Sequence, residues 1–151
     1  MKAKPIISLL LMLLVATAAG AQSASLKISR IFDGKVVPDD RMVVTKVKGP
    51  SLSKYGLCYY RSARFVATRK ERDLCAEAVK QDLKTAGQGS TVQQRAGRRS
   101  SVIGMLRPQG GYNRFVSLVC TKESGGQYGV TLLYMEGTVG SISELNKKIN
   151  K

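Results

Sequence analysis

Five arginines lie close together near the middle of the sequence, and their type and spacing make them the best candidates for a chemical role: Arg95, Arg98, Arg99, Arg107 and Arg114. A guanidinium group matches a phosphate or a sulfate through two parallel hydrogen bonds. The first three fall within residues 88–101, a segment rich in Gly, Ser, Thr and Gln that predicts a flexible basic loop able to fold over a ligand. We therefore predict an anion- or partner-binding site here, with a solvated loop that binds nothing as the alternative.

The residue types needed for most enzymatic mechanisms are missing. The chain contains no histidine, which excludes Ser-His-Asp and Cys-His catalysis within it and most zinc-enzyme ligand sets. Gly87-Gln88-Gly89 follows a predicted helix rather than a strand, so it does not match a phosphate-binding glycine motif. Glu136 is the one acidic residue at the end of an apolar strand, and we interpret it as a strand-end residue rather than a catalyst. We expect a protein that is not an enzyme, with no catalytic residue, metal or cofactor.

Three cysteines could matter in an oxidising compartment. Cys58 and Cys120 both fall in strand-like segments, which makes them the candidate disulfide pair. Cys75 lies in a predicted helix, where we expect a small buried apolar residue, with a reactive thiol as the alternative.

The charge balance restricts the partners. Lys and Arg number 25 against 10 Asp and Glu, which gives a formal net charge of +15. Two of these positive charges, on Lys2 and Lys4, lie in the first few residues. Such an excess predicts attraction to polyanions. We expect an anionic envelope glycan or lipid, or an envelope protein, as the partner, and no nucleic acid because of the predicted export described next. The alternative is that the charge only keeps the protein soluble.

The first 21 residues predict a secretory signal peptide. Two lysines precede an apolar run over residues 6–15, and Ala19-Gly20-Ala21 supplies the small side chains required for cleavage after Ala21, with Ala18 as the alternative position. The apolar run is about half of the roughly 20 residues that span a bilayer. We expect residues 22–151 to form a single exported domain that does not span the membrane, in the periplasm, secreted or at the cell surface.

The remaining segments alternate between strand and helix patterns. Thr68 and Glu71 form a capping box at the start of the clearest helix, which we expect to end before Gly87. Ser141 and Glu144 form a second such box before a short terminal helix. Apolar runs predict strands over residues 42–48, 57–66, 102–107, 113–121 and 128–136, and residues 26–32 predict a short strand or a strand after a turn of helix.

These elements predict an α+β fold in the order βββα-βββα. The sheet should be mostly antiparallel, because short turns join its strands, and the helices should pack on one face of it. We expect the apolar stripe of the main helix to lie in the core, with a partner-binding face as the alternative.

Several segments carry a resemblance to a known group of proteins. They are the leader ending in Ala-Gly-Ala-Gln, residues 26–35 (Leu-Lys-Ile-Ser-Arg-Ile-Phe-Asp-Gly-Lys), residues 54–62 (Lys-Tyr-Gly-Leu-Cys-Tyr-Tyr-Arg-Ser), Asn113-Arg-Phe115, and residues 132–138 (Leu-Leu-Tyr-Met-Glu-Gly-Thr). Over most of its length the chain resembles small uncharacterised exported proteins of Bacteroidales bacteria. The resemblance implies a bacterial envelope setting and a domain of one sheet with helices, and it implies no catalytic or binding residues.

Three hypotheses about function follow, of which the third is an enzyme that uses Glu136 or a free cysteine. The first is a non-enzymatic exported protein that contacts an anionic envelope component or an acidic partner through its arginine-rich segment. The second is a structural or assembly subunit of an envelope protein complex, recognised through a sheet edge or the apolar helix face.

Overall fold

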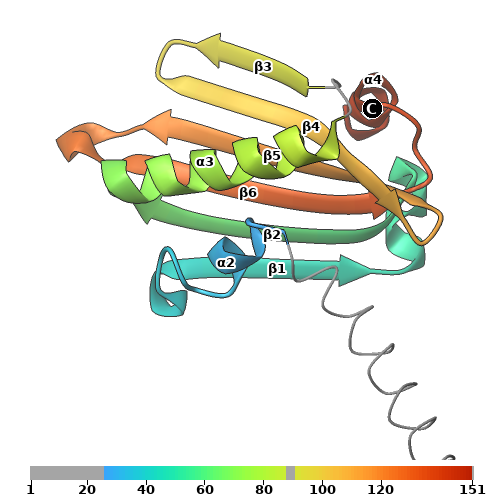
Figure 1. The fold of residues 1–151 in the computed structure, drawn as a ribbon, viewed down its shortest axis with the longest axis horizontal. Coiled ribbons are helices and arrows are strands. Elements are labelled where there is room, and N and C mark those ends of the chain that lie inside the picture. The colour runs from blue at the N-terminus through green and yellow to red at the C-terminus, as the bar shows by residue number, and fades with distance from the viewer. Residues whose placement is uncertain (1–25, 88–90, 151) are drawn as a thin grey trace, which may run out of the picture.

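A computed structural model describes residues 26–87 and 91–150, and the predicted leader lies outside this range (Figure 1). Six strands, four of them of ten residues or more, form the body of the protein. In chain order the elements are α2 (Ser29–Phe32), η1 (Asp39–Arg41), β1 (Met42–Lys48), η2 (Pro50–Tyr55), β2 (Leu57–Ala67), α3 (Arg69–Ala86), β3 (Thr91–Ala96), β4 (Arg99–Gln109), β5 (Tyr112–Lys122), η3 (Ser124–Gly126), β6 (Tyr128–Gly137) and α4 (Ile142–Ile149).

The strands form one antiparallel sheet in the order β1-β2-β6-β5-β4-β3. The α+β class and the antiparallel sheet are therefore confirmed, but the order βββα-βββα is wrong. Only two strands precede α3 and four follow it, because residues 29–32 are helical and residues 91–96 form an extra strand. The C-terminal strand β6 inserts between β2 and β5, so the middle of the sheet joins the two halves of the chain (Figure 1).

The sheet has a hydrophobic core on each face, and so the prediction that the helices pack on one face is also wrong. On one face, α2 and α3 cover the apolar side chains of the central strands, among them Leu132 and Val116. On the other face, α4 and η2 cover Phe115 and Met135. Successive strand residues point to opposite faces, and both parities of β5 and β6 are apolar, so each face needs a cover.

The main helix forms as its sequence predicts. The Thr68 hydroxyl accepts from the backbone N–H of Glu71 at 3.2 Å, and the Glu71 carboxylate accepts from the backbone N–H of Thr68 at 2.9 Å. Gly87 ends the helix with a φ of 64°, a left-handed conformation that suits glycine. Of the second predicted box, Ser141 caps α4, whereas the Glu144 carboxylate accepts from the N–H of Gly140 instead of closing the box.

Residues 26–32 contain a short helix and no strand, so of the prediction of a short strand, or a strand after a turn of helix, only the helical turn is found. Ile28, Ile31 and Phe32 are buried together, and their spacing of three and four places them on one side of a helical turn. The buried carboxylate of Asp82 on α3 accepts from the backbone N–H groups of Lys27, at 2.8 Å, and Ile28, at 3.0 Å. A residue far along the chain thus accepts the hydrogen bonds of the backbone N–H groups just before α2, and no local sequence pattern reveals this contact.

Substituting Glu71 with glutamine should make the stability less dependent on pH in acid. The Arg41 guanidinium donates two hydrogen bonds of 3.0 Å to Glu71 and lowers the pKa of that carboxylate, as does the Thr68 cap. A lowered pKa stabilises the folded state above the ordinary glutamate pKa, and this contribution disappears as the pH falls through the folded-state pKa. Urea unfolding from pH 7 to pH 3 should show the wild type and Glu71→Gln converging at the acid end. A difference that stays constant over this range would contradict the assignment.

Candidate anion-binding cleft

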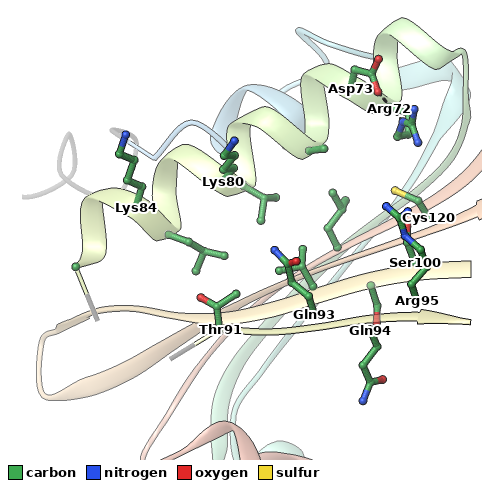
Figure 2. Close-up of a pocket in the computed structure, with 17 residues that line it drawn as sticks. Arg72, Asp73, Lys80, Lys84, Thr91, Gln93, Gln94, Arg95, Ser100 and Cys120 are labelled. Carbon is green, nitrogen blue, oxygen red and sulfur yellow. Dashed lines mark ion pairs between the residues drawn. The ribbon is translucent and has the colours of Figure 1, made fainter. Parts of the chain in front are cut away.

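A large cleft separates α3 from the outer strands of the sheet. It has a volume of about 1070 Å³, with α3 as one wall and β3, β4 and β5 as the other. Thr91, Gln93 and Arg95 extend from β3 toward the helix, while Gln94 points to the opposite side of the sheet (Figure 2). Leu83, Val102 and Leu118 line the cleft where the helix approaches the sheet. We call this cavity the α3 cleft.

The arginine-rich segment is ordered as a hairpin, which corrects the predicted flexible loop over residues 91–101. β3 pairs with β4 from Thr91 opposite Gly104 to Ala96 opposite Arg99, so Gly97 and Arg98 form a two-residue turn. Gly97 has a φ of 59°, as a tight hairpin turn requires at its first central position. Residues 88–90 lie outside the described residues. The hairpin holds Arg95, Arg98 and Arg99 at fixed positions on the sheet.

One end of the α3 cleft is strongly basic, and it opens into a second hollow of about 560 Å³. The two cavities share Arg72, Arg95, Ser100 and Cys120. Five cations line this region, which we call the basic end: Arg72, Arg95, Arg98, Arg99 and Lys122. Among the described residues, Glu123 is the only acidic one that lines the second hollow. The arrangement therefore offers guanidinium groups from α3, β3 and β4 to one bound anion.

Arg72 is held in place at the junction of the two cavities. Its Nε lies 2.8 Å from Oδ1 of Asp73, and its guanidinium carbon lies 4.3 Å from the centre of the Tyr128 ring. Stacking on an aromatic ring leaves the edge of a guanidinium available for planar hydrogen bonds. Arg95, Arg98 and Arg99 form no ion pair within the described residues. Their charges are therefore available to a ligand.

Two lysines extend the basic character along the helix. Lys80 and Lys84 line the α3 cleft, but their side chains leave α3 on the side away from the strands (Figure 2). They lie at the outer rim, where they can attract an anion but do not reach the cavity floor. Sequence reasoning did not single out these lysines, or Arg72 and Lys122. Three of the four stand on a helix whose charges, read alone, indicate only a solvated surface.

The five arginines predicted as one site belong to two separate regions. Arg107 lies eight residues beyond Arg99 on β4, which corresponds to about 26 Å along a strand. Arg114 is buried, and its Nε donates to the carbonyl of Arg107 at 2.7 Å. The structure therefore brings Arg95, Arg98 and Arg99 together at the basic end and places Arg107 and Arg114 at the opposite end of the sheet.

The cysteines do not form the predicted pair, and all three are free. Cys120 lies opposite Val130 on β6, whereas Cys58 lies near the other end of that strand, where Tyr59 is opposite Glu136. Six residues along a strand correspond to about 20 Å, far beyond the roughly 7 Å between Cα atoms that a disulfide allows. The prediction of a Cys58–Cys120 disulfide is therefore wrong. Two cysteines on strands can form a disulfide only if the register of the sheet places them close together, and being on strands is not enough.

Cys75 is buried in the core, as expected for a small apolar residue. Burial, with a smaller effect from the neighbouring Cys120, raises the pKa of the Cys75 thiol to about 12. A thiol with such a pKa carries almost no thiolate at neutral pH, so Cys75 is not an activated nucleophile.

Comparisons with known proteins place the chain in a family. Among the described residues, no group of three or more His, Cys, Asp and Glu side chains could hold a metal ion, and no described helix is long and apolar enough to cross a membrane. No curated protein matches the chain. The solved structure of the thermo- and acido-stable ORF-99 from the archaeal virus AFV1 is similar over 78% of this chain and 94% of that chain, with 10% identity and a TM-score of 0.32. Residues 14–149, well over half of the sequence, match a family of unknown function, and the chain therefore belongs to the family DUF6108.

Proposed function

We propose that this protein is an exported, non-enzymatic binding protein that holds an anionic envelope component, a glycan or a lipid, at the basic end of the α3 cleft. The observation that carries the proposal is the convergence of guanidinium groups from α3, β3 and β4 on one hollow, in whose lining the described part of the chain places a single acidic residue. A hollow lined by charges of one sign concentrates the opposite sign and increases the rate of association. The proposal includes export by the predicted leader and a location in the bacterial envelope.

Electrostatics sets the expected behaviour. Contacts among exposed charges are screened within about 10 Å at 0.1 M salt, so binding at the basic end should weaken steeply as salt is added. Arg95, Arg98 and Arg99 are all exposed, so salt ions screen their charges effectively.

A retention experiment on the cell envelope tests this. The full chain is expressed with its leader, and the purified product is immobilised, incubated with an envelope extract and washed at low and then high salt. We expect acidic glycan or lipid to stay bound at low salt and to elute at high salt. An unrelated basic protein of similar net charge serves as the control, because retention of the same material on both would contradict a specific cleft. An acidic protein eluting in place of glycan or lipid would also overturn this choice of ligand.

A second candidate function is an assembly subunit recognised through a sheet edge. The edge strand β1 exposes Val43, 67% accessible, and Val44, and the neighbouring β2 exposes Val66. An edge strand with unpaired backbone groups and exposed apolar side chains can accept a strand from a partner protein. The apolar helix face favours this function less, because α3 buries Cys75 and Val79 against the sheet. A discrete protein that survives the high-salt wash would support this candidate over the first.

A further inference from the structure

A second, smaller pocket lies between α2 and the sheet, at the opposite end from the basic end of the α3 cleft. Its volume is about 310 Å³, the lower end of the range for small-molecule sites. One part of its wall consists of apolar side chains from α2 and the preceding turn. The other part consists of five polar or aromatic side chains from β1, β2 and β6, namely Lys48, Tyr59, Arg61, Tyr134 and Glu136. We call this cavity the α2 pocket.

The polar wall is built by packing rather than left on the surface. The Tyr134 side chain is buried, and its hydroxyl donates to Glu136 Oε1 at 2.6 Å. Burial, and then the hydrogen bond to Glu136, raises the pKa of Tyr134 well above its usual value, so the phenol stays protonated and donates its hydrogen bond to Glu136. The rings of Tyr59 and Tyr134 meet edge to face, 6.0 Å apart. The acceptor oxygens of Glu136 are thereby fixed in direction.

The cations of this wall have no anionic partner within the described residues. Arg61 lies over the Phe32 ring, with its guanidinium carbon 4.3 Å from the ring centre, and its buried Nε makes no hydrogen bond. Lys48 lies over the Tyr59 ring at 5.7 Å. Behind the wall, the buried Arg114 is opposite Glu136 in the sheet, and its positive charge lies close to the Tyr134 hydroxyl. A buried donor without a partner costs free energy, so the unused donor of Arg61 indicates a missing acceptor.

The chemistry of the wall defines what could fill it. Lys48 and Arg61 can only donate hydrogen bonds, and they attract a negative group. Glu136 can only accept when ionised, so it needs a donor on the ligand. The aromatic and aliphatic side chains at α2 need an apolar or flat surface. We propose that the α2 pocket binds a small carboxylate that also carries a hydrogen-bond donor, with the carboxylate on Arg61 and Lys48 and the donor on Glu136.

An amino acid and a sugar acid both have this chemistry, and a titration followed by amide NMR distinguishes them. The probes are L-phenylalanine and D-glucuronate, each paired with a counterpart that lacks the carboxylate, L-phenylalaninol and D-glucose. We expect saturable shifts around Tyr59, Arg61 and Glu136 with at least one carboxylate, and at least tenfold weaker binding of its counterpart. The absence of saturation by either carboxylate at about 10 mM, where even a Kd of about 1 mM gives near-complete occupancy, would overturn the proposal.

Variants connect the binding to the named residues. Arg61→Gln should weaken binding about 10- to 100-fold, the range expected for losing a hydrogen bond between two charged groups. Lys48→Gln, at an exposed position that does not threaten folding, should weaken it about fivefold or less. Glu136→Gln should weaken binding of the amino acid more than that of the sugar acid, because only the ammonium loses a charged partner. Arg98→Gln, at the other end of the sheet, is the control, and an equal loss in this variant would refute the assignment to the α2 pocket.

Discussion

Replacing Arg95, Arg98 and Arg99 together by glutamine should weaken binding to polyanions about 100-fold at low salt. Each Lys or Arg close to an anionic surface contributes about 1 kcal/mol, and about 3 kcal/mol corresponds to roughly two orders of magnitude in affinity. The three side chains are exposed and form no ion pair within the described residues, so their removal should not disturb the fold. Binding to vesicles containing phosphatidylglycerol and to heparin, a sulfated glycan, would measure the loss over a series of salt concentrations.

A second triple variant separates the location of the charges from their number. Lys46, Lys54 and Arg64 are also exposed. They lie on β1, η2 and β2, toward the edge of the sheet opposite to β3 and β4. Their replacement by glutamine changes the net charge equally. We expect it to reduce affinity by less than about tenfold and to leave a steeper salt dependence than the cleft variant. Equal losses in both variants with both probes would show that net charge alone drives the binding.

Phe115→Ala should lower the free energy of unfolding by about 3 to 5 kcal/mol, the usual cost of removing a large buried aromatic side chain. Phe115 is fully buried in the core beneath α4, with Met135 and Met105 opposite it on the neighbouring strands. Few side chains can move into the cavity, because the sheet closes one side of it. Urea unfolding followed by circular dichroism would measure the change.

The strand itself provides the control for that substitution. Val119 lies on the same face of β5, four residues further along, but it is only half-buried. Val119→Ala should cost about 1 kcal/mol or less. Because Phe115 faces away from the α3 cleft, the folded fraction of Phe115→Ala should bind polyanions like the wild type. A cost of less than about 1 kcal/mol for Phe115→Ala would mean that the second core does not support the sheet.

The elements that the sequence predicted well are those with strong local signals. The capping box of Thr68 and Glu71 and the stop at Gly87 define α3 to the residue. β1 is found at its predicted bounds, Met42–Lys48, and β6 extends the predicted strand by one residue. In each case the capping or the apolar pattern lies within the element itself, so no distant residue was needed.

The missed elements depend on contacts across the fold. The sequence of β3 indicates a loop because all six of its residues are exposed, and an edge strand held only by β4 needs no apolar alternation. The sequence of residues 26–32 predicts a short strand, or a strand after a turn of helix, because the residue that satisfies the backbone of α2, Asp82, lies on α3. The cleft could be predicted in part, since Arg95, Arg98 and Arg99 are adjacent in sequence. Arg72 could not, because only the packing of α3 brings it to the hairpin.

The position of β6 between β2 and β5 has a consequence for how the chain folds. β2 can pair on its inner edge only with β6, from Leu57 opposite Gly137 to Ala67 opposite Tyr128, so the central pairing joins segments from the two ends of the domain. Contacts between distant segments require a large loop to close first, which makes them slow to form. We expect the first half of the domain to remain without its central partner during synthesis until residues 128–137 are available. The sheet therefore cannot be completed until the last strand, β6, has been synthesised.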